Sequence, residues 1–358
     1  MRLARKPPIG DSSAKRKLVP FYSKNNLHFC VRTYIRIVVS VALLTLIFWR
    51  IEWSDVGRHF AGLDLTLWLA AVGLYVLAQV ASARRWQLYA NELGFEQTLP
   101  QFCAYSFIGM FFSLFLPTLI GGDVLRVWYL NGSSGRKWPA IASVVLERIN
   151  GLLVLIAAAC VGVLISPVEL PAWLVASVWS IAGCAGIGVA FTPILRRWQR
   201  LPLERRCQIE AFQVMLRSPR LLIESTLMSI VVQIAAVLIL WCLGIGLGLD
   251  VPIAYYFVLV PMVSLLMLLP ISVNGMGVRE GATVLLLLPL GVDESAALAL
   301  AFLWFSTGVA ISVVGGVVYL FGSLPGRNSL TQRRKGAKRE TLSTTAAGSP
   351  IPAKSHLV

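Results

Sequence analysis

Long apolar runs without a single charged residue alternate with short polar segments along this chain. Each run reaches the roughly 20 residues that an α-helix needs to cross a bilayer. The runs are continuously apolar rather than alternating, a pattern that argues against a membrane β-barrel. The pattern therefore predicts an all-α polytopic membrane protein. The uncharged stretches are 97–122, 149–168, 170–195, 225–249, 251–278 and 295–326.

Basic residues in the polar segments predict how the helices are oriented. The tail 1–36, the loop 195–220 and the tail 323–358 are all rich in Lys and Arg. The positive-inside rule places such segments in the cytoplasm. We therefore expect a multi-pass protein of the bacterial cytoplasmic (inner) membrane with both termini inside. The net charge of +15 is interpreted as topology anchors beside anionic lipid, and no nucleic-acid partner is expected.

The same rule constrains the two apolar segments that are not simple spans. Arg84 and Arg85 are expected to stop the second span on the cytoplasmic side. The segment 101–130 must then cross an even number of times, either as a re-entrant hairpin or as two short spans. The segment 253–290 must begin and end outside for the same reason. The predicted full spans are about 35–51, 65–83, 141–165, 172–193, 221–247 and 296–321.

These two ambiguous segments share a pattern. In each, a Leu-Pro pair ends an apolar helix, a Gly follows five residues after the Pro, and an Arg follows nine residues after it. Pro breaks the helical hydrogen-bond ladder and Gly tolerates open backbone, so each segment is predicted to form two half-helices. In lipid such a break must be buried in protein or line a wet cavity. The matching residues are Leu116, Pro117, Gly122 and Arg126, then Leu269, Pro270, Gly275 and Arg279.

The contexts of the two segments also match, with opposite orientation. A helix, a broken hairpin and a helix make up residues 65–165, and the same order recurs in residues 221–321. Paired broken helices in inverted repeats point to a transporter site near the bilayer midplane. We therefore predict an inverted-repeat helical bundle with two broken re-entrant hairpins, although two unrelated Pro-Gly kinks are the alternative. The predicted domain is 34–322, between a basic tail at 1–33 and a basic disordered tail at 323–358.

Charged residues at membrane depth are the candidate site. Arg126 and Arg279 each follow a Gly-rich break near the start of a half-helix, where backbone N–H groups favour an anion. An adjacent guanidinium adds a bidentate phosphate grip. Local neutralisation by Asp123 is the alternative for Arg126. The predicted substrate-binding residues are Arg126, Arg279, Gly121, Gly122, Asp123, Asn274, Gly275 and Gly277.

Three further charges are predicted to couple protons or to pair within the bundle. Glu147 and Arg148 are adjacent, so they point to different faces of their helix. They could contact substrate in the cavity, or they could join helices with Arg126 or Arg279 as the partner of Glu147. Glu280 stands beside Arg279 and has the same two interpretations.

Residue types that support other chemistries are scattered or missing. The six cysteines form no CxxC pair and the three histidines lie outside the apolar runs, so neither a metal site nor a cofactor is predicted. The sequence has no P-loop and no Asp-rich diphosphate–magnesium motif. An enzymatic role is therefore the less favoured interpretation.

Three segments in order resemble the signatures of one family, the transmembrane domain of the lysylphosphatidylglycerol synthase/flippase type, also called flippase-like. The resemblance covers about residues 30–322. The residues that carry it are Phe111, Phe112, Leu116, Pro117, Thr118 and Ile120 to Arg126; Glu147 to Ile149 with Gly151 and Leu152; and Leu269 to Ser272 with Gly275 and Gly277 to Gly281.

The resemblance implies a lipid-related role. In two-part members of that family the membrane domain moves an aminoacylated phospholipid between leaflets, and a separate soluble domain makes the lipid. Only the tail 323–358 follows the membrane part here, so we expect a stand-alone member without lysyltransferase activity. The expected function is translocation of an anionic or phosphate-bearing lipid, such as an aminoacyl-phospholipid or lipid-linked precursor. The alternatives are an intramembrane transferase with Glu147 and Glu280 as bases, or an assembly factor that partners a lipid-synthesis enzyme.

Overall fold

The computed structural model describes residues 64–115, 121–166, 168–195, 218–269 and 272–321, together with residues 38 and 45. These residues form nine α-helices and one 3-10 turn and contain no strand, which confirms the all-α polytopic prediction. Apart from residues 38 and 45, the predicted span 35–51 lies outside the described residues, as do both tails. Five helices are long and apolar enough to cross a membrane: α3 (Leu65–Glu92), α6 (Lys137–Ile165), α7 (Ala172–Leu195), α9 (Pro219–Gly246) and α12 (Glu294–Phe321).

The four remaining helices are short and form two broken hairpins at the predicted places. They are α4 (Leu99–Phe115), α5 (Gly121–Ser134), α10 (Ile253–Met267) and α11 (Val278–Leu287), the last followed by the turn Leu288–Leu290.

The second break shows why these residues leave the helix. Asn274, Gly275 and Gly277 all have positive φ angles, of 51°, 74° and 81°. Glycine adopts this left-handed conformation without strain and Asn tolerates it better than most residues. The chain can therefore turn between α10 and α11. The prolines of both breaks, Pro117 and Pro270, lie outside the described residues.

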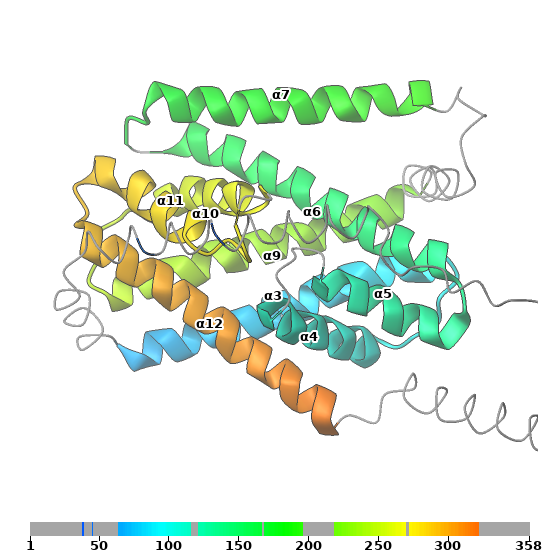
Figure 1. Cartoon of the computed structure of the whole chain (residues 1–358). Coiled ribbons are helices and arrows are strands. Elements are labelled where there is room, and N and C mark those ends of the chain that lie inside the picture. The colour runs from blue at the N-terminus through cyan, green and yellow to red at the C-terminus, as the bar shows by residue number, and fades with distance from the viewer. Residues whose placement is uncertain are drawn as a thin grey trace, which may run out of the picture.

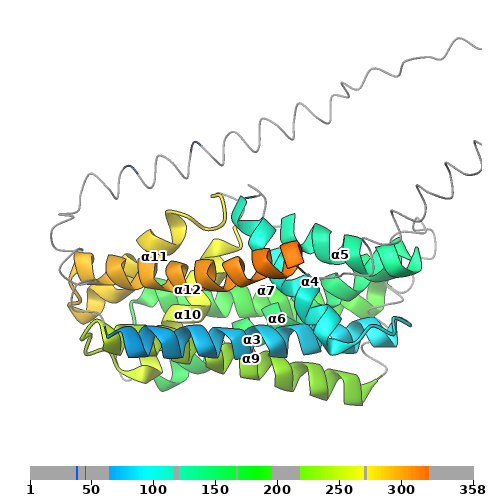
Figure 2. The same cartoon turned by 90° about the horizontal axis from the view of Figure 1, so that it is seen from below.

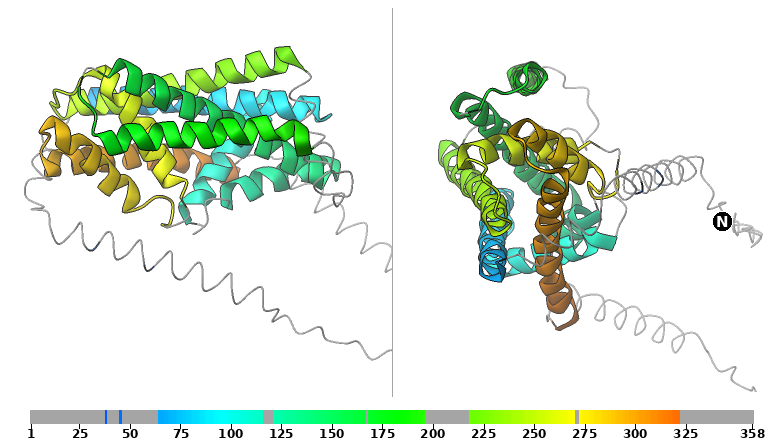
Figure 3. Two further views of the ribbon diagram at one scale, coloured as in Figure 1. Left: turned by 90° about the horizontal axis from the view of Figure 1, so that it is seen from above. Right: turned by 90° about the vertical axis from the view of Figure 1, so that its left-hand side faces the viewer.

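The two hairpins occupy opposite ends of the bundle. In Figure 1 the pair α4–α5 lies toward the right end of the long helices and the pair α10–α11 toward their left end. Figure 2 and the left view of Figure 3 show the same separation, with both hairpins pointing toward the middle. Helix α7 lies at the edge of the bundle against α6, as the right view of Figure 3 shows.

Charges divide between the two ends of the bundle. Among the described residues, the left end in Figure 1, where α3 and α12 begin, carries acidic residues; the right end, where α6 and α9 begin, carries basic residues together with Glu92, Glu96 and Glu224. We call these the acidic end and the basic end. The acidic end is defined by Asp64, Glu169, Asp250, Asp293 and Glu294, and the basic end by Arg84, Arg136, Lys137 and Arg220.

Each hairpin packs against the last long helix of the other half of the chain. Helix α4 packs on α12 and α10 packs on α6, while α3 and α9 pack on each other. A Cβ on Gly315 of α12 would lie 2.0 Å from the carbonyl oxygen of Phe107 in α4. A Cβ on Gly162 of α6 would lie 2.4 Å from that of Phe257 in α10. The same sequence spacing separates the two glycines as separates Arg126 from Arg279. The inverted repeat stays a prediction, and this exchange of partners favours it.

Helix α3 continues past its predicted end. We expected the second span to stop near residue 83 at Arg84 and Arg85, but the helix runs to Glu92. Arg84 is exposed as expected, whereas only 6% of Arg85 is accessible. Neighbouring residues on a helix point about 100° apart, so one arginine of the pair faces outward and the other faces the bundle.

Candidate functional site

The first cluster of the site starts at the beginning of α5, which directly follows the helix break. Gly121 and Gly122 are its first residues and both are buried. A Cβ on Gly122 would lie 2.4 Å from the carbonyl oxygen of Gly109 and 2.2 Å from Oγ of Ser113, both on α4. Only glycine allows α5 to approach α4 this closely. The close approach places Asp123, in the first turn of α5, beside α6.

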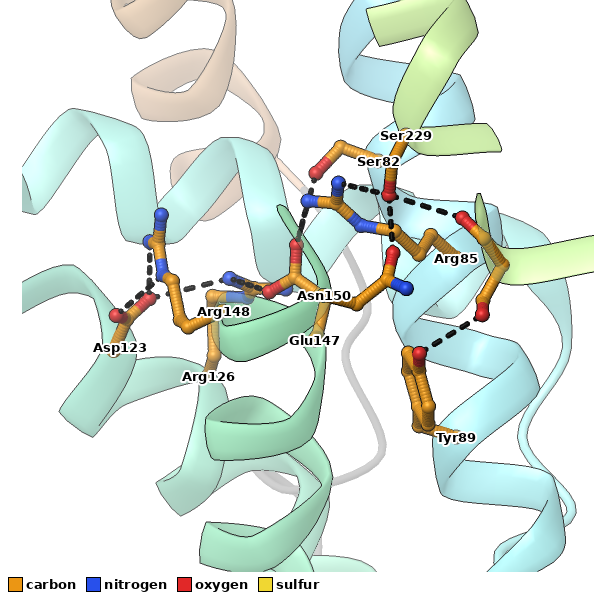
Figure 4. Close-up of polar contacts among 10 residues, drawn as sticks. Ser82, Arg85, Tyr89, Asp123, Arg126, Glu147, Arg148, Asn150 and Ser229 are labelled. Atoms are coloured by element: carbon orange, nitrogen blue, oxygen red, sulfur yellow. Dashed lines mark hydrogen bonds and ion pairs between the residues drawn. The ribbon is translucent and has the colours of Figure 1, made fainter. Parts of the chain in front are cut away.

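Two arginines bind the carboxylate of Asp123. Arg148 of α6 donates two hydrogen bonds to it, Nε to Oδ2 at 3.0 Å and Nη2 to Oδ1 at 2.7 Å. Arg126 Nη1, one turn further along α5, lies 3.2 Å from Oδ1. The predicted local pairing of Asp123 with Arg126 is present, and Arg148 is an additional partner (Figure 4).

Glu147 occupies the centre of the network, and 1% of its side chain is accessible. Its Oε2 lies 3.2 Å from Arg126 Nη1, and its Oε1 accepts hydrogen bonds from Arg85 and, at 3.3 Å, from Ser82. Glu147 therefore joins α3, α5 and α6. Of the two partners we predicted for this carboxylate, Arg126 contacts it; no ion pair with Arg279 is present in the described part of the chain.

Arg85 is the member of this network that sequence reasoning missed. It also donates to Ser229 Oγ of α9 at 2.8 Å. Gly151 leaves room for it, because a Cβ there would lie 3.1 Å from Arg85 Nη1. The available signal was spacing: Ser82, Arg85 and Tyr89 recur every three or four residues and so share one face of α3.

The network continues into α9 through neutral groups. Ser229 Oγ donates to the side-chain oxygen of Asn150, and the amide of Asn150 donates to Thr226 at 3.2 Å. Tyr89 donates to Ser225 Oγ at 2.8 Å. Figure 4 shows the network extending from Asp123 through Glu147 and Arg85 to Ser229 of α9. The buried charges are thus tied to the central α3–α9 pair.

A second cluster lies at the start of α11. Arg279 pairs with Glu280, and its guanidinium carbon lies 4.6 Å from the centre of the Phe305 ring. Glu280 Oε2 also accepts the Gly277 backbone N–H at 2.6 Å. We predicted that an external anion would bind near this helix start, and pairing of Glu280 with Arg279 was the alternative for Glu280. The pairing is present, and the carboxylate of Glu280 caps this helix start from within the chain.

Two adjoining cavities connect the clusters. The larger, about 390 Å³, is lined by Arg148, Arg279 and Asn274, and also by Trp304 and Phe305 of α12. The smaller, about 210 Å³, is lined by residues of the first cluster, namely Asp123, Arg126 and Arg148, together with Ser82, Ser106, Gln79, Gly109 and Gly122. Both cavities share Tyr75, Met110, Ser113 and Arg148 in their walls.

The arginines in these walls retain hydrogen-bonding capacity. Arg126 is 6% accessible, and its Nε and Nη2 find no hydrogen-bond partner within the described ranges. Its guanidinium carbon lies 4.2 Å from the centre of the Trp86 ring. Arg279 Nε is likewise buried with no such partner among the residues described. Arg148 is different, because 61% of its side chain is accessible.

The charged residues that line these two cavities are all among the predicted site residues. Asp123, Arg126, Glu147 and Arg148 form one network with Gly122 at its edge, and Asn274 and Arg279 line the larger cavity. Gly275 and Gly277 shape the turn before α11, and Glu280 caps it. Among the described residues, no group of three or more His, Cys, Asp and Glu is placed to hold a metal ion.

Comparison with known proteins identifies the family. Residues 34–316 match the family described as the lysylphosphatidylglycerol synthase TM region. The match covers well over half of the chain and includes both hairpins and the long helices described here, with α12 included as far as residue 316. No curated protein matches the chain.

Proposed function

Because the chain belongs to the lysylphosphatidylglycerol synthase TM-region family, we propose that it translocates an anionic, phosphate-bearing lipid between membrane leaflets. The family supports a membrane lipid-related role, and multi-pass character is supported by the five long apolar helices. We place the protein in a bacterial cytoplasmic membrane with the basic end toward the cytoplasm, following the positive-inside rule. Its substrates would be anionic phospholipids or lipid-linked precursors, with a lipid-synthesis enzyme as a possible partner.

One observation carries the proposal: three arginines line two adjoining cavities at the breaks of the two hairpins. Arg148 belongs to both cavity walls, Arg126 to the smaller and Arg279 to the larger. Ionisable groups inside a membrane bundle are costly and usually mark a substrate pathway. A guanidinium binds phosphate oxygens in a planar, bidentate way, so these three side chains suit a phosphate headgroup.

The dimensions fit a headgroup rather than a whole lipid. A cavity of about 390 Å³ lies near the lower end of the roughly 300–1,000 Å³ typical of small-molecule sites. The acyl chains would remain in the bilayer while the headgroup passes through the wet interior. Because the hairpins approach the site from opposite ends of the bundle (Figure 1), alternate opening of each would give access to one leaflet at a time.

No contact in the described residues favours the transferase alternative. That mechanism needs Glu147 or Glu280 as a general base. Both carboxylates are held in buried ion pairs, with Glu147 bound by Arg85 and Arg126 and Glu280 bound by Arg279. Their oxygens already contact donors of the chain itself, and only 1% of each side chain is accessible, so neither carboxylate is open to a substrate proton.

Transbilayer movement of headgroup-labelled phosphatidylglycerol in proteoliposomes tests the proposal. The wild type should move the lipid. The assay is run first without a proton gradient and then with one. Arg126→Gln/Arg279→Gln should lower the rate about tenfold or more, since each charge-assisted hydrogen bond contributes roughly 1.5–3 kcal/mol. Arg148→Gln should also slow it; this side chain is largely accessible, so its replacement should cost little stability.

Arg220→Gln is the matched control, because Arg220 pairs with Glu224 on an exposed surface away from both cavities. It should move lipid at the wild-type rate. Equal rates in the wild type, in Arg126→Gln/Arg279→Gln and in Arg148→Gln would contradict the proposed site. No movement of phosphatidylglycerol or other anionic lipids by wild type, with or without the gradient, would contradict the function.

A further inference from the structure

The geometry of Asp123 suggests a role beyond pairing. Its two carboxylate oxygens receive two parallel hydrogen bonds from Arg148, at 3.0 and 2.7 Å. That fork-to-fork arrangement is the one in which a guanidinium holds two oxygens of a phosphate. The carboxylate also lies in the first turn of α5, the position at which a helix favours an anion. Asp123 therefore occupies the position that a phosphate would occupy.

The surroundings of Asp123 favour exchange rather than a permanent bond. Asp123 and Arg148 both line the smaller cavity, and 17% and 61% of their side chains are accessible. Arg126, the second arginine at this carboxylate, keeps Nε and Nη2 without a hydrogen-bond partner in the part of the chain described here. An incoming anion would thus find donors from both arginines. By contrast, the side chain of Glu147 is 1% accessible and forms ion pairs with arginines of α3 and α5.

The charge balance has the same implication. The cluster combines the positive charges of Arg85, Arg126 and Arg148 with the negative charges of Asp123 and Glu147, an excess of one positive charge. If Asp123 swings away, Arg148 loses this partner and Arg126 keeps only Glu147. The excess of the cluster then rises to two positive charges, and another anion in place of the carboxylate would restore the balance.

We propose that Asp123 is an internal phosphate surrogate, which closes the arginine site by occupying it and is displaced when a phosphate-bearing headgroup binds. The inference rests on the proposed function, because it takes the ligand to be the phosphate of a lipid. It makes Asp123 a competitor of the substrate and not one of its ligands.

Binding to the detergent-solubilised full chain tests this directly by isothermal titration calorimetry. The probes are inorganic phosphate and dihexanoyl-phosphatidylglycerol, with uncharged dihexanoylglycerol as the blank. Asp123→Asn should tighten binding of both anions about tenfold, the effect of one charge-assisted hydrogen bond lost by the competitor. Asp123→Ser, a smaller neutral side chain that helix starts accept, should do the same. Glu224→Gln, which breaks an exposed carboxylate–arginine pair, should change nothing.

A double variant separates competition from a general gain in positive charge. In an Arg148→Gln background, Asp123→Asn should improve binding less than about twofold, because the hydrogen bonds for which the two anions compete have been removed. A gain of the same size in both backgrounds would overturn the proposal. So would unchanged or weaker binding by both Asp123→Asn and Asp123→Ser in folded protein.

The outcome also separates this inference from the proposed function. Tighter anion binding in a chain that moves no lipid would uphold the surrogate and reject the flippase. A gain confined to inorganic phosphate would uphold the surrogate as well and identify the ligand as a free anion. If the wild type instead moves lipid while the Asp123 variants bind anions no more tightly than it does, that result would uphold the flippase and reject the surrogate.

Discussion

Glu147 illustrates how much one buried side chain can determine. It is almost inaccessible and bridges Arg85 of α3 to Arg126 of α5. A buried ion pair contributes little net stability relative to apolar packing, but removing one partner leaves the other charge buried and uncompensated. We therefore expect a loss of stability mainly in variants that remove one partner of the ion pair and leave the other charge buried.

Glu147→Gln should lower the free energy of unfolding by about 3 kcal/mol, the lower end of the range for breaking a buried pair. Arg85→Gln should have a similar effect, and the double variant should cost less than the sum of the two. Unfolding in mixed detergent micelles measures all three. Glu224→Gln is the control, because its partner Arg220 is exposed and such pairs contribute little. Additive costs would mean that Glu147 and Arg85 are not coupled.

Residue types and spacing predicted which charged residues lie inside the bundle better than they predicted the ion-pair partners of those residues. Asp123, Arg126 and Glu147 could be assigned to the bundle interior because long apolar runs surround them. Their pairing depends on which helices meet, which a single sequence does not record. Arg85 was missed for a related reason: beside Arg84 it matches a cytoplasmic stop signal, and only the packing of α3 on α6 and α9 turns it inward.

Helix breaks were predictable because their causes are local. A proline removes a backbone donor and glycines permit positive φ, whatever surrounds them. The partners of each hairpin were not predictable, because a face that contacts lipid and one that contacts another helix are equally apolar. The exchange of partners between α4 on α12 and α10 on α6 therefore emerges only from the structure.

Gly162 and Gly315 permit these two helix contacts. Alanine at either position would place a Cβ 2.4 or 2.0 Å from a carbonyl oxygen of the facing helix. We expect Gly162→Ala and Gly315→Ala each to lower the free energy of unfolding by about 1–3 kcal/mol, as overpacking of a tight interface does. Unfolding in mixed micelles provides the measurement.

Gly183 of α7 is the matched control for both substitutions. A Cβ there would meet nothing within 4 Å. Alanine also favours the helix by up to about 1 kcal/mol relative to glycine, so Gly183→Ala should be neutral or stabilising. If Gly162→Ala and Gly315→Ala behaved like Gly183→Ala, the close approach of α4 to α12 and of α10 to α6 would be wrong.

At the scale of the whole molecule, the positions of the two hairpins follow the division of charge between the two ends of the bundle. The α4–α5 hairpin lies at the basic end and the α10–α11 hairpin at the acidic end. The positive-inside rule predicts that the basic end faces the cytoplasm. That orientation would decide which leaflet each hairpin faces and, under the proposed function, which leaflet the arginine cavity serves first.

Cysteine accessibility in spheroplasts tests that orientation. Lys137 and Asp250 are both exposed and lie at the basic and acidic ends. In a background without native cysteines, Asp250→Cys should react with a membrane-impermeant maleimide from outside, and Lys137→Cys should react only after permeabilisation. The opposite pattern would place the basic end outside and reverse the access of each hairpin. Labelling of both residues from outside would contradict the separation of the two ends by a bilayer.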